Sequence, residues 1–285
     1  MAPIGEGKAI EIGFSSYSGG DFLLFYAALL LAAVVAGLWI PAFLRPDGRN
    51  AGPVGSEALA YLAGGASRFA ESVTASLLGR DQLRAERKKL VRMPRAEGRT
   101  RAEQALLRSG AELRWKGARY MLGAHADALD RELSAKGLLI APAERTTFRI
   151  IPVLPYIVLL LLGAFRWQAG YAQGEPVGFL TLLMVATAAL AVIRFVRFNP
   201  RTRAGEELLA ETQRASERLR SATPADEAGR AVALFGTGVL VGTPWASLHQ
   251  MRSQTSAGGC GGGGGHDGGG DGGGCGGGGC GGCGG

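Results

Sequence analysis

The residues best suited to chemistry are the cysteines and a histidine of the C-terminal tail. Residues 256–285 are almost entirely glycine, and the soft metal ligands among them are Cys260, His266, Cys275, Cys280 and Cys283. Cys280 and Cys283 form a CxxC pair, a spacing that thiolates use to bind Zn²⁺. The other spacings are irregular, and glycine offers no packed surroundings to orient such ligands. We therefore predict no resident cofactor, with zinc at the tail as the alternative.

The same tail allows two other interpretations. Glycine loses much conformational entropy on ordering and buries no side chain, so the segment 256–285 is predicted to be disordered on its own. Its thiols also suit covalent modification, because a cysteine can cyclise onto a preceding carbonyl without hindrance from glycine. All four cysteines of the chain lie in this tail. No disulfide framework is therefore predicted for the folded parts.

The second group with a chemical use is a cluster of six cations within 12 residues: Arg84, Arg87, Lys88, Lys89, Arg92 and Arg95. It could hold the phosphates of anionic lipid headgroups, or those of a nucleic acid. No aromatic residue is interleaved with these cations, which disfavours single-strand binding. A solvated face that only fixes membrane topology is the simplest interpretation, so nucleic acid is the less favoured partner.

Motifs of catalysis are missing from the sequence. There is no nucleophile–base pair, phosphate-binding loop or paired-carboxylate motif, and the GTGVLVG at 236–242 has the wrong spacing for a dinucleotide fingerprint. The sequence therefore predicts a non-enzymatic, membrane-anchored binding or scaffold protein. The alternatives are a membrane-tethered nucleic-acid-binding regulator, or the carrier of a tail that is modified or binds metal.

Three apolar segments organise the rest of the chain, and we predict transmembrane helices at 22–44, 149–166 and 177–197. At 1.5 Å per residue, each covers most of a hydrocarbon core about 30 Å thick. A short polar turn at 167–176 joins the last two into a hairpin. The first segment is long and lacks a basic flank before it, so we predict a retained anchor rather than a cleaved signal peptide. No ionisable residue lies between the flanks of these segments, which argues against an ion-coupled transporter.

The charge distribution predicts the orientation. The whole chain carries a net charge of +7, and residues 45–145 alone contain 19 Lys and Arg against 12 Asp and Glu. The positive-inside rule places that loop in the cytoplasm and the segment 1–21 outside, with the C-terminus inside. The arginines that flank the three segments agree: Arg45, Arg49, Arg145, Arg149, Arg194, Arg197, Arg201 and Arg203. The predicted partner is the lipid bilayer; the sequence does not identify a protein partner.

Between the first two segments, a linker at 45–55 precedes a basic cytoplasmic domain at 56–148. Apolar residues recur at helical spacing, and the pair Gly64 and Gly65 breaks the first run into two helices. A shift of 56 residues pairs Val73 with Leu129, so that helix, basic corner and short strand occur twice. This pattern predicts a mainly α-helical domain with short β-hairpins, the second at 136–150, arranged as a tandem winged helix.

Residues 198–255 are predicted to form a cytoplasmic helical segment. From Ala231 to Met251 there is no Asp, Glu, Lys or Arg, but the dense apolar run covers only 231–241. A run of about 11 residues is too short to span, so we predict a membrane-docked helix. The alternative is a fourth transmembrane helix, which would place the tail outside.

Four features of the chain carry a resemblance to a known family. They are the anchor ending near Pro41, the LAYLAGG of Leu59 to Gly65, the ALFG of Ala233 to Gly236, and the CGGGGC of the tail. With these features the chain resembles uncharacterised bacterial membrane proteins whose shared domain ends in a Gly/Cys-rich tail. The resemblance implies a multi-span protein of the bacterial cytoplasmic membrane, and it transfers no catalytic residue.

Overall fold

The computed structural model describes residues 19–49, 52–86, 89–172 and 178–257. The chain divides into two compact units. The first, called here the apolar unit, consists of Met1–Asp47 and Ile140–Pro200; the second, called the mixed unit, consists of Gly48–Leu139 and Arg201–Gly285. Each unit is therefore built from two stretches of chain that are far apart in the sequence.

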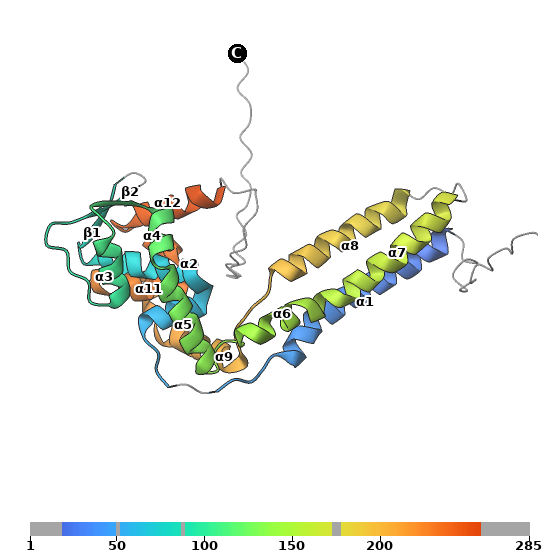
Figure 1. Ribbon diagram of the computed structural model, residues 1–285, viewed down its shortest axis with the longest axis horizontal. Helices are drawn as coiled ribbons and strands as arrows, with labels where there is room; N and C mark the ends of the chain where they lie inside the picture. Colours follow the sequence, from blue (N-terminus) through green and yellow to red (C-terminus); the bar gives the residue numbers. More distant parts are fainter. Residues whose placement is uncertain (1–18, 50–51, 87–88, 173–177, 258–285) are drawn as a thin grey trace, which may run out of the picture. The chain divides into compact units, whose positions relative to one another are not determined.

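The apolar unit is built from long helices. Its elements are α1 Gly19–Leu44, α6 Pro142–Ile150, the 3-10 turn η1 Ile151–Val153, α7 Leu154–Ala172 and α8 Gly178–Val196. Helices α1, α7 and α8 pack on one another and lie side by side in Figure 1. Within the described residues, three stretches are long and apolar enough to cross a membrane: Asp21–Ile40, Pro142–Ala172 and Gly178–Val196. The prediction of three such helices is thus confirmed.

The side chains of the apolar unit are distributed differently from those of a water-soluble bundle. Its interior holds a polar contact, in which the Tyr26 hydroxyl lies 3.2 Å from Thr187 Oγ1. Its outer face is apolar: Leu31 and Leu161 are each 67% exposed. A large continuous apolar surface is rare on proteins that work in water.

Helix α7 extends beyond the predicted boundary. The predicted turn at 167–176 begins too early, because α7 continues to Ala172 and stacks the rings of Trp167 and Tyr171 at 5.5 Å. At the other end, Pro152 lies in the 3-10 turn η1, between α6 and α7. Proline lacks an amide donor, which explains the change in helix geometry there. The predicted outer segment lies mostly within 1–18, outside the described residues.

The mixed unit contains many shorter elements. We call α7 and α8 the apolar hairpin. The elements of the mixed unit that precede this hairpin are α2 Ser56–Gly79, β1 Leu83–Glu86, β2 Lys89–Arg92, α3 Arg101–Arg108, β3 Glu112–Arg114, α4 Trp115–Met121 and α5 Gly123–Ala135. Those after it are α9 Arg203–Ala215, α10 Arg218–Ser221, η2 Ala225–Glu227, α11 Ala228–Phe235, η3 Thr237–Leu240 and α12 Ala246–Ala257. Figure 1 shows α2 and α11 together within this unit.

The core of the mixed unit forms where α11 packs against α2. A Cβ at Gly229 would lie only 2.7 Å from the Ser76 Cβ, so glycine permits this close approach. The Ser72 hydroxyl donates to the Gly229 carbonyl at 2.8 Å. Phe69 of α2 and Val232 of α11 are fully buried in the same apolar cluster. The segment after Pro200 therefore completes the core of the domain that begins at Gly48.

This packing answers the question of a fourth transmembrane helix. Residues 231–251 belong to α11, η3 and α12, which are separate short elements. Their apolar side chains Val232, Leu240 and Leu248 are buried in the mixed unit. An eight-residue helix such as α11 covers less than half of a bilayer core. The predicted membrane-docked helix at 231–241 and the alternative of a fourth span are both wrong, since these apolar residues pack against protein.

The described strands form one antiparallel sheet in the order β1-β2-β3, with Leu83 opposite Arg92 and Leu90 opposite Leu113. The second predicted hairpin, at 136–150, is wrong because residues 142–150 form α6. Pro142 suits the first turn of a helix, and Arg149 lies in the last turn, where a cation is favourable. Without that hairpin the predicted tandem arrangement of winged helices does not form.

Candidate functional site

Helix α2 is interrupted at Gly64 and Gly65. Gly64 has φ −161° and ψ 27°, and Gly65 has φ 65° and ψ −158°. Glycine reaches the positive φ of Gly65 at little cost, which explains this residue at the break. An interrupted helix leaves carbonyl groups before the break without their helical partners.

Arg201 caps the helix before this break. Its Nε donates to the Leu62 carbonyl at 2.6 Å, and its Nη2 donates to the Ala63 carbonyl. A guanidinium at the C-terminal end of a helix also offsets the negative end of the helix dipole. The first half of α2 is thus capped by Arg201, which follows the apolar hairpin in the sequence.

Arg68 lies on the other side of the break. Its Nε is 3.7 Å from Glu71, and its Nη1 donates to the Val232 carbonyl of α11 at 3.3 Å. A Cβ at Gly236 would collide with the Arg68 guanidinium, and Gly236 has φ +85°. Gly64 of LAYLAGG and the final glycine of ALFG therefore both lie against the Arg68 side chain.

These groups open onto a cleft of about 710 Å³, which we call the basic cleft. It is lined by Ala63, Arg68, Arg201, Leu209, Ala210, Gln213, Arg214, Glu217, Arg220, Leu234, Phe235, Gly238 and Val239. Four of these side chains are guanidinium groups and one is a carboxylate. Arginine presents planar pairs of donors that match phosphate and carboxylate groups, so this cleft suits an anion.

The arginines of the basic cleft are held to different degrees. Arg68 is mostly buried, with a side-chain exposure of 16%, and the buried Glu71 beneath it also contacts Arg252 at 2.6 Å. Arg214 and Arg220 are exposed at the rim. Arg220 pairs with Glu217 at 3.5 Å, but both side chains are at least 60% exposed, and such pairs contribute little. The cleft therefore combines fixed cations in its wall with cations at its rim.

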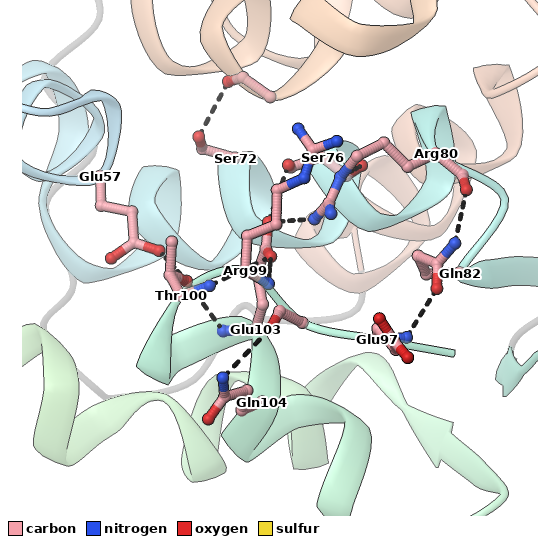
Figure 2. Close-up of polar contacts among 12 residues, drawn as sticks. Glu57, Ser72, Ser76, Arg80, Gln82, Glu97, Arg99, Thr100, Glu103 and Gln104 are labelled. Atoms are coloured by element: carbon pink, nitrogen blue, oxygen red, sulfur yellow. Dashed lines mark hydrogen bonds and ion pairs between the residues drawn. The ribbon is translucent and has the colours of Figure 1, made fainter. Parts of the chain in front are cut away.

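A second polar cluster surrounds Glu103, as Figure 2 shows. The Glu103 carboxylate pairs with Arg80 at 2.5 Å and accepts a hydrogen bond from Ser76 at 2.8 Å. It also accepts from the backbone amides of Arg99 and Thr100, completing a capping box at the start of α3. Because these contacts join α2 to α3, the cluster supports the fold.

The pKa values of two carboxyl groups in this cluster, Glu57 and Glu103, are shifted in opposite directions. Burial raises the pKa of Glu57, and the charge of Glu103 adds to the rise, while the Thr100 hydrogen bond and His125 oppose it. Burial would also raise the pKa of Glu103, but the Arg80, Arg99 and Ser76 hydrogen bonds outweigh it and lower that pKa. None of these residues lines the basic cleft. Opposite shifts of this kind accompany structural networks as well as active sites.

The structure places part of the predicted cation cluster on the β1–β2 hairpin. Arg84 and Arg92 lie on neighbouring strands and are exposed. Lys89 pairs with Glu112 at 2.5 Å, and Arg92 donates to the Leu107 carbonyl at 3.0 Å. Arg95 follows the hairpin with φ 62°. Arg87 and Lys88 lie outside the described residues, and binding of lipid or nucleic-acid phosphates by this cluster stays a prediction.

The predicted metal ligands are Cys260, His266, Cys275, Cys280 and Cys283. All five lie outside the described residues, so zinc binding and modification of the tail stay predictions. Among the residues that the structure describes, no group of three or more His, Cys, Asp or Glu could hold a metal ion.

Sequence reasoning did not find the basic cleft. Its arginines are spread from Arg68 to Arg220, and none belongs to the predicted cation cluster. The available signals were Gly64 and Gly236, where the absence of a Cβ makes room for the Arg68 side chain. No protein-family model, curated protein or solved structure matches this chain.

Proposed function

We propose that this chain is a membrane-anchored binding protein whose mixed unit takes a small anionic ligand in the basic cleft. The observation that carries the proposal is the convergence of Arg68, Arg201, Arg214 and Arg220 on one cleft. The side chains of Arg68 and Arg201 are already held by hydrogen bonds to backbone carbonyl groups. They therefore lose little conformational entropy when a ligand binds.

The ligand class follows from size and charge. A volume of about 710 Å³ lies in the usual range for small-molecule sites. Four guanidinium groups suit a ligand with two or more anionic groups, such as a phosphorylated metabolite. Leu209, Phe235 and Val239 add an apolar wall that could contact the uncharged part of such a ligand. Arginine stays protonated and cannot exchange a proton with a substrate, which favours binding over catalysis.

The anchoring part of the proposal rests on the apolar unit. Its three long helices expose large apolar side chains, and a bilayer would cover them. Arginines flank the predicted inner ends, so we propose a multi-pass protein of the bacterial cytoplasmic membrane with its N-terminus outside. The mixed unit and the tail would then be in the cytoplasm.

Binding is tested with inorganic pyrophosphate as the probe, titrated into the full chain in a neutral detergent at constant ionic strength. We expect saturable binding by isothermal calorimetry, weakened on the order of tenfold for each of R214Q and R220Q, since a hydrogen bond to a charged group is worth about 1.5 kcal/mol. The control R119Q/R131Q removes two exposed arginines outside the cleft. Equal weakening in the control, or no saturable binding, would contradict an anion site in the cleft.

Anchoring is tested separately by alkaline extraction of membranes and by thiol labelling of the tail. We expect the chain to stay in the membrane pellet, and a membrane-impermeant maleimide to label its cysteines only after permeabilisation. Release by alkali would contradict a spanning protein. Labelling of intact cells would contradict the proposed orientation.

A further inference from the structure

The apolar unit contains a second cleft, of about 310 Å³, that the proposed function does not use. We call it the helix-end cleft, because it is formed where α1 and α8 end and where α6 meets η1. Its cationic lining residues are Arg45, Arg149, Arg194 and Arg197, and its lining includes no Asp or Glu. This cleft therefore combines four positive charges with the ends of the apolar helices.

Two of these arginines are held in position by the unit itself. Arg149 Nε donates to the Phe195 carbonyl at 3.2 Å, and its guanidinium lies 4.8 Å from the centre of the Phe195 ring. Arg194 Nε donates to the Gly37 carbonyl of α1 at 2.9 Å. Each of these bonds uses Nε, and each guanidinium also carries four N–H donors on its terminal nitrogens.

Apart from Asn199, the rest of the lining is apolar. Leu38, Ile40 and Leu44 of α1 contribute to it, together with Phe148 and Pro152. Leu38 is 68% exposed and Leu44 is 45% exposed, so apolar surface continues outward from the cations. A free phosphate ion would use the cations and leave this apolar surface in contact with water. A phospholipid would use both.

We propose that the helix-end cleft binds the headgroup phosphate of an anionic phospholipid, with an acyl chain along the apolar surface beside Leu38 and Leu44. The inference rests on the proposed membrane anchoring. In that orientation the cleft lies at the inner membrane surface, since all three candidate spans end or begin near it. Basic pockets between transmembrane helices on the cytoplasmic side are suited to anionic headgroups.

The test uses the full chain in a neutral detergent and native mass spectrometry. Phosphatidylglycerol, phosphatidylcholine and the soluble probe glycerol 3-phosphate are each titrated into the protein. We expect phosphatidylglycerol to be retained in preference to the other two. R197Q should weaken its retention about fivefold and R149Q/R197Q roughly 30-fold, the equivalent of about 1 kcal/mol for each cation. The control R119Q/R131Q removes equal charge from the mixed unit and should retain the lipid like the unmodified chain.

Each other outcome contradicts part of the inference. Equal retention of the two lipids, or unchanged retention in the variants, would show that the arginines do not select an anionic lipid. Binding of glycerol 3-phosphate as tight as that of the lipid would make this a soluble phosphate site. Arg197 is exposed, so R197Q keeps the test valid if R149Q disturbs folding. Alkaline extraction of membranes distinguishes the proposed anchoring from the proposed lipid site. If the chain stays in the membrane but shows no preference for phosphatidylglycerol, only the lipid site is contradicted.

Discussion

Helices α1 and α11 are both rich in apolar residues, yet their side chains have opposite surroundings. Leu24 and Leu38 of α1 are each more than two-thirds exposed, whereas Ala231, Val232 and Ala233 of α11 are fully buried. Helix α1 has 26 residues and packs on α7 and α8 along one side, while α11 has eight and packs chiefly against α2. Apolar composition therefore does not identify a membrane helix; length and the supply of protein partners do.

The largest expected effect comes from replacing one valine by aspartate in each of the two helices, in separate variants. V232D places a carboxylate in the core of the mixed unit, and we expect a loss of about 3–5 kcal/mol in the free energy of unfolding. V35D changes a residue of α1 that is 47% exposed, and we expect it to disfavour membrane insertion by about 2.5–3.5 kcal/mol instead. Circular dichroism in denaturant and cell fractionation measure the two effects. A V232D protein as stable as the unmodified chain would contradict the burial of Val232 in a protein core.

The mixed unit holds a buried charged network around Glu103. E103Q weakens the contacts with Arg80 and two backbone amides, and we expect a loss of about 1.5–3 kcal/mol in the free energy of unfolding at pH 7. The matched control is E112Q, whose ion pair with Lys89 has both side chains more than half exposed. We expect the control to change the free energy by less than about 1 kcal/mol.

The pH dependence sharpens this prediction. The folded-state pKa of Glu103 is lowered, so its contribution is present at neutral pH and is lost as the pH falls through that pKa. The difference between the unmodified chain and E103Q should therefore shrink below about pH 4. Glu57 has a raised pKa and acts in the opposite sense, because its ionisation disfavours the folded state as the pH rises. An E103Q difference that stays constant in acid would contradict the role of the carboxylate charge.

The close approach of α2 and α11 predicts the next effect. G229A adds a Cβ that would lie 2.7 Å from Ser76 Cβ and 3.1 Å from the Ser72 carbonyl oxygen. We expect it to lower the free energy of unfolding by about 1–3 kcal/mol through overpacking. The control G123A is also in a helix but meets nothing within 4 Å. We expect the control to be neutral or to stabilise by up to about 1 kcal/mol, with thermal unfolding as the measurement.

The smallest effect is expected inside the apolar unit. Y26F removes the hydroxyl that lies 3.2 Å from Thr187 Oγ1. Polar contacts between membrane helices are worth about 0.6 kcal/mol on average, so only a small loss of stability is expected in detergent. Tyr171 is 70% exposed, and Y171F should have no effect. Unfolding in a denaturing detergent compares the two; a large loss in Y26F would show that this contact organises the three helices.

The two polar sites differ in how far the sequence predicts them. Thr100 and Glu103 have the Thr-x-x-Glu spacing of a capping box, so that part of the Glu103 cluster was open to prediction. The basic cleft was not, because Arg201 and Arg214 reach it only after the chain has passed through the apolar hairpin. Local spacing determines a helix cap, but it says nothing of residues that meet across more than 100 positions.

The sequence by itself determined three long apolar helices, the break at Gly64 and Gly65, and the extended basic segment that forms β1 and β2. Each depends on local composition, periodicity or backbone freedom. Only the tertiary structure decided that residues 142–150 are helical and that 231–251 belong to a protein core. It also decided that Arg68 and Arg201 share one cleft. These outcomes depend on which surfaces remain exposed after distant segments have packed. The short apolar run of α11 could by itself face either a bilayer or protein, and its packing against α2 decides for protein.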